Sequence, residues 1–266
     1  MPPAIQAAIL GVVQGVTEFL PVSSTAHLLI AGRLLGFDDP IFTIMIQLGS
    51  IFAVIWLYRA KLFDVLRGLP TQPSARRFVV MLLVALLPAL IAGAALSGFV
   101  TRVLYRTLLV NAVTFVVGGI IILIVERSKT PPTVHHVDNT PVSKAFGIGV
   151  CQAIAIIPGI SRSGATIIGG LALGLDRAVA TEFSFFLAIP TLTAAFANSL
   201  WKARHDLTSA QTTNIAIGFV MAFISSALVI KPFLNYVRRS GFQAFAWYRI
   251  VAGLALAAAI AAGWGR

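Results

Sequence analysis

The sequence has few charged residues, and acidic residues are the scarcest of them. Charged side chains make up 11% of the 266 residues, and only nine residues are Asp or Glu. Hydrophobic residues make up 58% of the chain, and its mean hydropathy is +0.91. A chain this apolar has too little polar surface to fold in water as a soluble domain. We therefore expect an integral membrane protein.

Two further absences narrow the class of protein. The single cysteine, Cys151, has no partner for an internal disulfide, so it is predicted to be a packing residue. The first residues carry no basic stretch and no small-residue cleavage pattern, so we expect no cleaved signal peptide.

The net charge of +11 could suggest a nucleic-acid partner. Lys and Arg fall between apolar segments, however, which the positive-inside rule explains, so no nucleic-acid binding is expected.

Long apolar runs are abundant. Six are long enough to cross a bilayer as helices, namely residues 41–59, 78–100, 104–126, 179–201, 212–230 and 246–264. Regions 3–36 and 143–176 differ, because each has two shorter apolar pieces separated by Pro21 or by Pro158-Gly159. Such pieces are typical of re-entrant helical hairpins, whose broken backbone must be covered by protein or line a wet cavity.

The two broken regions are similar to each other in sequence. Gly11-Val-Val-Gln14 is matched by Gly149-Val-Cys-Gln152, and in both copies a proline and then a group of hydroxyls follow. Three predicted spans follow each region, so the second copy would enter the membrane from the opposite face. The sequence therefore predicts an all-α integral membrane protein with six transmembrane helices and two re-entrant helical hairpins in an inverted-topology repeat.

The positive charges predict an orientation. We expect one membrane domain over residues 1–266, with repeat 1 at about 3–126 and repeat 2 at about 143–264. Thirteen Lys and Arg fall on one side of the spans and six on the other, so the richer side should be cytoplasmic. Both termini and the mouth of the first hairpin should then face outside, toward the periplasm. The larger set comprises Arg59, Lys61, Arg67, Arg76, Arg77, Arg127, Lys129, Lys144, Arg177, Lys231, Arg238, Arg239 and Arg249.

The first break carries candidate acid–base groups. Gln14 and Glu18 lie four residues apart, which places them on one face of the first short helix. A carboxylate at membrane depth is costly, so it suggests a functional site. The helix after the break begins with an N-cap signature and presents a histidine in its first turn: Ser23, Ser24, Thr25 and His27.

The second break carries candidate anion-binding groups. Four polar residues follow Pro158-Gly159 and open another short helix: Ser161, Arg162, Ser163 and Thr166. Two helix N-termini, several hydroxyls and an arginine make a site that suits phosphate. Together with Glu18 and His27, this inventory is what hydrolysis of a phosphoric anhydride requires.

Each of these residues also has a purely structural interpretation. Hydroxyls after a proline are most often helix caps, and His27 could be a satisfied polar group between helices. Glu18 and Arg162 could pair as a bridge between the hairpins. Such a bridge would leave the hydroxyls and His27 unexplained.

The two polar segments also carry a family resemblance. The sequence resembles the bacterial undecaprenyl-diphosphate phosphatases associated with bacitracin resistance, through Gln14-Gly-Val-Thr-Glu-Phe-Leu-Pro-Val-Ser-Ser-Thr-Ala-His27 and Pro158-Gly-Ile-Ser-Arg-Ser-Gly-Ala-Thr166. The similarity continues through Ile46–Gly49 and Phe183–Pro190. The resemblance implies an enzyme of the bacterial cytoplasmic (inner) membrane that removes the terminal phosphate of undecaprenyl diphosphate, recycling the lipid carrier for peptidoglycan synthesis and conferring bacitracin resistance.

The resemblance also implies roles for residues. Catalysis is expected from Glu18, Ser24, His27 and Arg162, and phosphate binding from Ser161, Arg162, Ser163 and Thr166. Ser23 and Thr25, which flank Ser24 in the hydroxyl cluster, are expected to bind phosphate as well. The family allows Glu or Gln at the position of Gln14, so here this residue would support the site by a neutral hydrogen bond. A divalent cation, Mg²⁺ or Ca²⁺, is expected by resemblance, with Glu18 as its protein ligand. A single carboxylate does not predict a metal cage by itself.

Several alternatives remain open at the level of sequence. Ser24 is the preferred nucleophile, but attack by His27 or by water activated by Glu18 is also compatible with the residues. The rival function is a transporter that flips the lipid phosphate, since inverted repeats and broken helices also occur in secondary transporters. The expected partners are the lipid substrate and membrane lipids, and a homodimer is compatible with the sequence.

Overall fold

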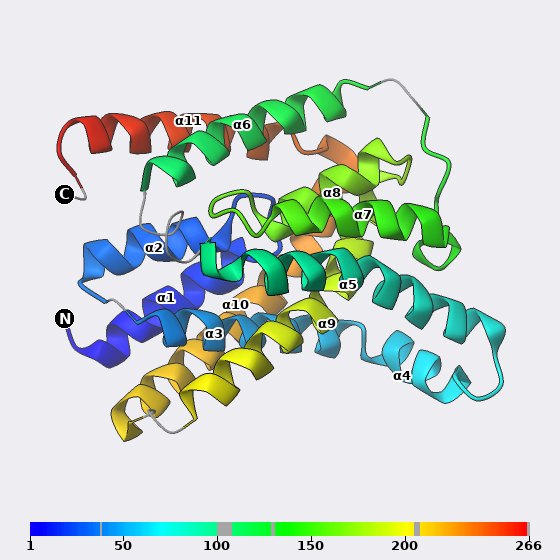
Figure 1. Cartoon of the computed structure of the whole chain (residues 1–266), viewed down its shortest axis with the longest axis horizontal. Coiled ribbons are helices and arrows are strands. Elements are labelled where there is room, and N and C mark those ends of the chain that lie inside the picture. The colour runs from blue at the N-terminus through cyan, green and yellow to red at the C-terminus, as the bar shows by residue number, and fades with distance from the viewer. Residues whose placement is uncertain (38, 100–107, 129–130, 205–207, 265–266) are drawn as a thin grey trace. The chain divides into compact units, whose positions relative to one another are not determined.

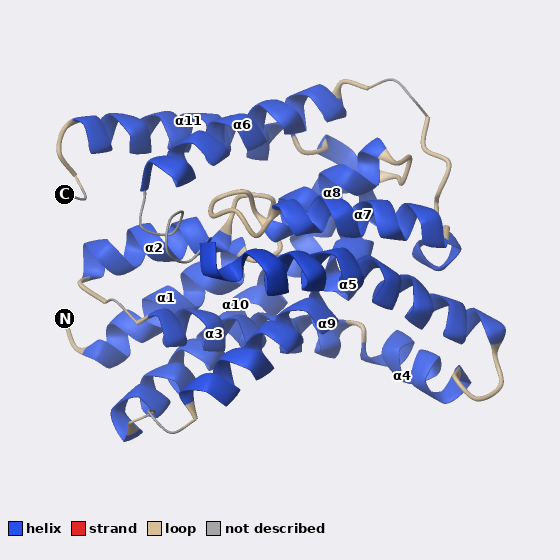
Figure 2. Cartoon of the chain, viewed as in Figure 1, coloured by secondary structure: helices blue, strands red, loops and turns tan. Residues whose placement is uncertain are grey.

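The computed structural model describes residues 1–37, 39–99, 108–128, 131–204 and 208–264, and within them helices are the only regular elements of any length (Figure 2). The chain divides into two compact units. Unit 1 comprises residues 1–19, 24–79 and 185–233, and unit 2 comprises residues 20–23, 80–184 and 234–266. Both units therefore draw on both halves of the sequence. The predicted boundaries of the two repeats remain a prediction.

The six predicted spans correspond to long helices. They are α3 (Pro40–Leu57), α5 (Pro73–Phe99), α6 (Leu108–Glu126), α9 (Arg177–Ala203), α10 (Ser209–Ser240) and α11 (Gln243–Ala261). Five of them are long and apolar enough to cross a membrane singly, and α3 makes a sixth when it is counted with the helix that follows it. The prediction of an all-α membrane protein is therefore confirmed. Residues 104–107, the expected start of the third span, lie outside the described residues.

The segment between the predicted spans 41–59 and 78–100 contains a further helix. Helix α4 (Arg59–Gly68) follows α3 at a bend of 75°. Arg59 stacks on Trp56, and Arg67 stacks on Phe63. Both aromatic rings are exposed, and each guanidinium carbon lies over its ring, 4.6 and 4.3 Å from the centroid, as in a cation–π contact. A short, charge-rich helix gives little apolar periodicity, which is why the sequence did not predict it.

The two broken regions are broken in the structure as well. The first consists of α1 (Pro3–Thr17) and α2 (Ser24–Leu35), and the second of α7 (Val142–Ile154) and α8 (Arg162–Ala172). At 1.5 Å per residue these helices are roughly 16–23 Å long, shorter than the roughly 30 Å hydrocarbon core. We call the connecting segments break 1 (residues 18–23) and break 2 (residues 155–161).

Break 1 and break 2 share a backbone feature. Ser23 and Ser161 are the only non-glycine residues with positive φ among the described residues, with φ of 70° and 74°. They are separated by 138 residues, as are Gln14 and Gln152. A positive φ is strained for a residue with a side chain, so its recurrence at matched positions supports the internal repeat.

In unit 1, α1 packs closely on the first part of α10. A Cβ on Gly11 would lie 2.4 Å from the carbonyl oxygen of Gly218, so only glycine allows this approach. In unit 2, a Cβ on Gly149 of α7 would lie 2.2 Å from the carbonyl oxygen of Ala85 in α5. Helix α1 thus packs on α10, and α7 packs on α5. By their order in the two copies, α1 corresponds to α7 and α5 corresponds to α10.

Helices α6 and α11 of unit 2 run side by side in opposite directions (Figure 1). Their contacts are reciprocal, because a Cβ on Gly119 would lie 2.6 Å from the Ala246 oxygen and one on Gly253 would lie 2.8 Å from the Ala112 oxygen. These helices are the last spans of the two copies. Their antiparallel packing is what an inverted repeat requires.

Candidate active site

Residues of unit 1 form an acid–base group around Glu18. The hydroxyl of Ser24 donates to Glu18 Oε2 at 2.6 Å, and the amide of Gln14 donates to the same oxygen at 2.8 Å. Glu18 is 5% exposed, Gln14 is fully buried and Ser24 is 9% exposed. Gln14 and Glu18 share the face of α1 on which Ser24 docks, as their spacing predicted. A hydroxyl bonded to a buried carboxylate is the arrangement of a nucleophile and its base.

Thr25 and His27 lie in the first turn of α2, and both are half-buried. Helix α2 begins at Ser24, which makes Ser23 the residue at its N-terminal boundary. The N-cap signature in the sequence therefore located this helix start. His27 is three residues after Ser24 and so lies on the same side of the helix.

Unit 2 contains break 2 together with residues 20–23 of break 1. Ser161 is the N-cap of α8, and its Oγ accepts a hydrogen bond from Gly164 N at 3.0 Å. Its hydroxyl also lies 3.1 Å from that of Ser163, which donates to the carbonyl oxygen of Leu20 at 2.8 Å. The structural interpretation of Ser161 as a cap is therefore confirmed. Ser163 joins the two breaks directly.

Arg162 and Thr166 converge on Ser184, a residue that the sequence did not assign to the site. Arg162 Nη1 donates to the carbonyl oxygen of Ser184 at 3.0 Å and lies 3.4 Å from its hydroxyl. Thr166 Oγ1 lies 2.7 Å from Ser184 Oγ. Ser184 is fully buried in α9 and lies in the Phe183–Pro190 stretch that carried part of the family resemblance, which was the available signal.

Arg249 corrects one part of the charge count. The sequence placed it among the cytoplasmic cations, but it lies inside α11 and is 1% exposed. Its guanidinium donates to the carbonyl oxygens of Pro21 and Ile160, both at 3.0 Å. The assignment was wrong because a single arginine at the start of an apolar run looks like an interfacial residue. Its partners are backbone atoms far away in the chain.

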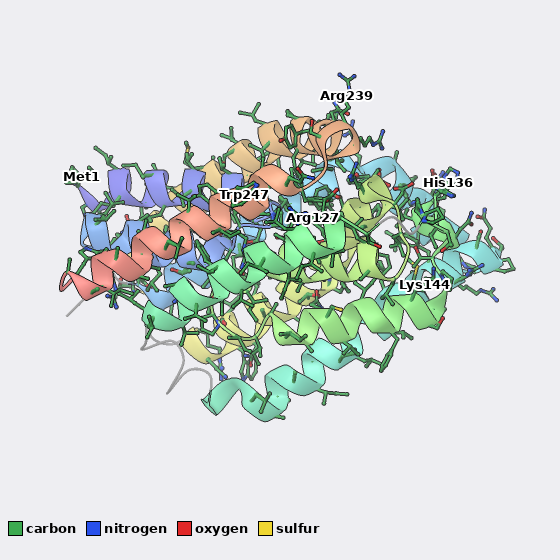
Figure 3. The ribbon with its side chains drawn as sticks, turned by 90° about the horizontal axis from the view of Figure 1, so that it is seen from above. Met1, Arg127, His136, Lys144, Arg239 and Trp247 are labelled. Carbon is green, nitrogen blue, oxygen red and sulfur yellow. The ribbon has the colours of Figure 1, made fainter. Side chains whose placement is uncertain are left out.

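Three other cations of the larger set are labelled in Figure 3. Arg127, Lys144 and Arg239 lie toward the same end of this unit, and the carboxyl end of α11 lies toward the other (Figures 1 and 3). His136, also labelled in Figure 3, is exposed at the same end. The smaller set comprises Arg33, Arg102, Arg106, Lys202, Arg204 and Arg266. Of the two sets, Arg102, Arg106, Lys129 and Arg266 lie outside the described residues.

The oxygen atoms around Glu18 fit a divalent cation that takes most of its ligands from water and substrate. Gln14 Oε1 is a buried acceptor without a hydrogen-bond partner, and the Glu18 carboxylate lies on the same helix face. No group of three or more His, Cys, Asp or Glu that could hold a metal occurs among the described residues. Mg²⁺ commonly binds one or two carboxylates and completes its shell with water and substrate phosphates.

The two groups of residues are continuous in the chain. Ser23 belongs to unit 2 and Ser24 to unit 1, so one peptide bond links the hydroxyl cluster of the breaks to the Glu18 group. One group offers a carboxylate with a bonded hydroxyl, and the other offers an arginine and hydroxyls at a helix N-terminus. The first suits nucleophilic attack and the second suits a phosphate anion.

Comparisons with known proteins identify the family. The sequence model of the bacitracin resistance protein BacA family matches residues 7–255. The chain is 45% identical over 262 residues to an undecaprenyl-diphosphatase of Paracoccus denitrificans, covering 98% of each chain. It is 49% identical over 254 residues to one of Rhizorhabdus wittichii (94% of this chain, 95% of the relative) and 49% identical over 258 residues to undecaprenyl-diphosphatase 2 of Rhodospirillum rubrum (96% and 94%). This chain belongs to the bacitracin resistance protein BacA family.

Proposed function

We infer that this membrane protein hydrolyses undecaprenyl diphosphate to undecaprenyl phosphate and inorganic phosphate, which recycles the lipid carrier for peptidoglycan synthesis. The family and the names of its relatives support this activity. The observation within the structure that carries it is the 2.6 Å hydrogen bond from the Ser24 hydroxyl to buried Glu18.

In the proposed mechanism, Ser24 Oγ attacks the terminal phosphorus and its proton passes to Glu18. The new bond joins Oγ to phosphorus, and the bond from phosphorus to the bridging oxygen breaks. Its electron pair leaves with undecaprenyl phosphate. Water then attacks the phosphoserine, the Oγ–phosphorus bond breaks, and the proton held by Glu18 returns to Ser24. His27, on the same side of α2, is placed to take the proton of that water.

The residues of break 2 supply the second part of the mechanism. Arg162 and the N-terminal turn of α8 would hold the phosphate and balance its charge as the anhydride bond breaks. Ser23, Thr25, Ser161, Ser163 and Thr166 would add hydroxyls to this cradle. The hydrogen bonds of Arg162 and Thr166 to Ser184 fix the direction of the arginine side chain, which lowers the cost of ordering it around the substrate.

A divalent cation, Mg²⁺ or Ca²⁺, is part of the proposal. Glu18 and Gln14 Oε1 would hold it, with substrate oxygens and water completing its ligands. Such an ion neutralises charge on the diphosphate and makes phosphorus easier to attack.

The protein is a multi-pass membrane protein, and we propose the bacterial cytoplasmic membrane as its location. The cation-rich ends of the helices would face the cytoplasm, with both termini outside. The isoprenoid tail would remain in lipid. The homodimer remains a prediction. The mass of the purified protein in detergent would test it.

The activity can be tested without any contribution from transport. Purified protein in detergent should release phosphate from undecaprenyl diphosphate, and Ser24→Ala should abolish the release. A lipid flippase would give no phosphate under these conditions. The flippase alternative is not favoured, because anion transport requires an arginine and backbone amides but no hydroxyl bonded to a buried carboxylate.

A further inference from the structure

The guanidinium of Arg249 is bonded entirely to backbone carbonyls. Besides Pro21 and Ile160, it donates from Nη2 to Thr114 and Gly159, both at 2.9 Å, and from Nε to Phe115 at 3.4 Å. These contacts use all five N–H donors of the side chain. Arg249 forms no ion pair with a carboxylate in the described part of the chain. A buried charge of this kind is costly unless its hydrogen bonds are complete, so the contacts are specific to arginine.

The carbonyls come from three segments that are far apart in sequence. Pro21 lies in break 1, Gly159 and Ile160 lie in break 2, and Thr114 and Phe115 lie in α6. Where a helix is interrupted, its carbonyls lose the helical N–H groups that would bond them. Arg249 therefore supplies hydrogen-bond donors to carbonyl oxygens of both breaks at once. Its planar fork also fixes their spacing, because one Nη1 atom bonds Pro21 and Ile160 together.

The neighbouring helix is adapted to this side chain. A Cβ on Gly118 of α6 would lie 2.3 Å from Nη2 of Arg249 and 2.7 Å from its Cζ. Glycine is thus the only residue that leaves room for the guanidinium here. The ring of Phe115 completes the pocket, with its centroid 5.3 Å from Cζ.

We propose that Arg249 is a positioning residue that holds break 1 and break 2 in register and so places the hydroxyls that follow them. This inference rests on the proposed phosphatase function and deepens it. Ser23 and Ser24 lie two and three residues after Pro21, and Ser161 and Arg162 follow Ile160. A shift of about 1 Å between reacting groups can cost about a hundredfold in rate. Arg162 is also held by Ser184 of α9, and the lipid tail still binds, so we expect the effect on kcat rather than on KM.

The first test replaces Arg249 by lysine. An ammonium keeps the charge but reaches at most three acceptors from one point, so it cannot span both breaks as the fork does. For Arg249→Lys we expect kcat to fall at least about thirtyfold with KM within about threefold of the parent. Arg249→Met, which also removes the charge, should lose no less.

A second measurement does not depend on activity. In Arg249→Lys, the amides of Val22, Ser23, Gly159, Ile160 and Ser161 should exchange with deuterated solvent at least about tenfold faster, whereas those of α3 should not change. Loss of the fold as a whole would speed exchange in α3 as well, so this comparison separates local release from unfolding.

The third test leaves Arg249 in place. Gly118→Ala drives a methyl group into the guanidinium and should lower kcat at least about tenfold. Gly93→Ala is the matched control, because a Cβ at Gly93 of α5 meets no atom within 4 Å. In the Arg249→Met background, Gly118→Ala should have little further effect, since the Nη2 and Cζ atoms that it strikes are gone.

The outcomes separate the two proposals. If the parent protein releases no phosphate, the phosphatase function fails, and the exchange rates of the breaks alone decide the role of Arg249. If the parent is active, a kcat of Arg249→Lys within about threefold of the parent overturns the positioning role. Unchanged exchange at both breaks, or additive losses in the double variant, would overturn it as well.

Discussion

Replacement of Glu18 by glutamine tests the acid–base group with the smallest change of shape. Glutamine keeps an oxygen that accepts from Ser24 and Gln14, whose donor atoms lie 2.6 and 2.8 Å from Glu18 Oε2. It removes the base, and loss of a general base typically costs about 10²- to 10⁴-fold in rate. Because 1.36 kcal/mol corresponds to tenfold, the barrier should rise by about 3–5 kcal/mol.

The same substitution should affect stability much less. Hydrogen bonds to a charged group contribute about 1.5–3 kcal/mol and neutral ones about 0.5–1.5, so two weakened bonds cost about 2 kcal/mol. Removal of a buried charge offsets part of that cost. Phosphate release under saturating substrate measures kcat, and thermal unfolding in detergent measures the folded fraction.

A neighbouring residue provides the control. Thr17 is 8% exposed, and its hydroxyl donates to Val13 O at 2.6 Å within its own helix. Thr17→Val should therefore keep kcat within about threefold of the parent. A folded Glu18→Gln protein that also keeps kcat within threefold would refute the role of Glu18 as the base. An equal loss in Thr17→Val would assign the effect to packing of this segment.

Three other outcomes are expected. Arg162→Lys should lower kcat/KM at least about tenfold despite the retained charge, because the fork that grips two phosphate oxygens is lost; a loss below threefold would contradict the clamp. In a Cys151→Ser background, a cysteine at position 74 should react with an impermeant reagent only from the cytoplasm, and one at position 209 only from outside. Three spans separate the two positions, so labelling of both from one face would contradict the inverted topology. A chelator should stop phosphate release, and added Mg²⁺ or Ca²⁺ should restore it; full activity in chelator would exclude the cation from the mechanism.

Much of the fold was predictable because hydropathy and proline report directly on membrane helices. The runs at 78–100 and 246–264 match α5 and α11, since a bilayer demands long apolar segments wherever the chain crosses it. Pro21 and Pro158 marked both breaks because proline removes a helical hydrogen bond. Ser23 and Ser161 were expected as caps, but their positive φ depends on tertiary contacts.

The remainder of the site depends on contacts that no local pattern encodes. Ser184 is a small hydroxyl in an apolar helix, and its importance follows only from the approach of Arg162 and Thr166. Arg249 follows Trp247 and Tyr248, a sequence that is typical of the membrane interface. Its true partners are backbone carbonyls, which carry no side-chain signature at all. The bond between Ser24 and Glu18 was anticipated as one of several possibilities, and the structure supplied its geometry.

The most direct test of the central claim is to trap the covalent intermediate. Substitution of His27 by glutamine should slow breakdown of a phosphoserine while leaving Ser24 and Glu18 intact. Protein mixed with undecaprenyl diphosphate bearing a labelled terminal phosphate is quenched in acid within milliseconds and digested, and the labelled peptide is identified by mass spectrometry. We expect acid-stable phosphate on Ser24. Acid-labile phosphate on His27 of the parent protein, or substantial turnover by Ser24→Ala, would contradict it.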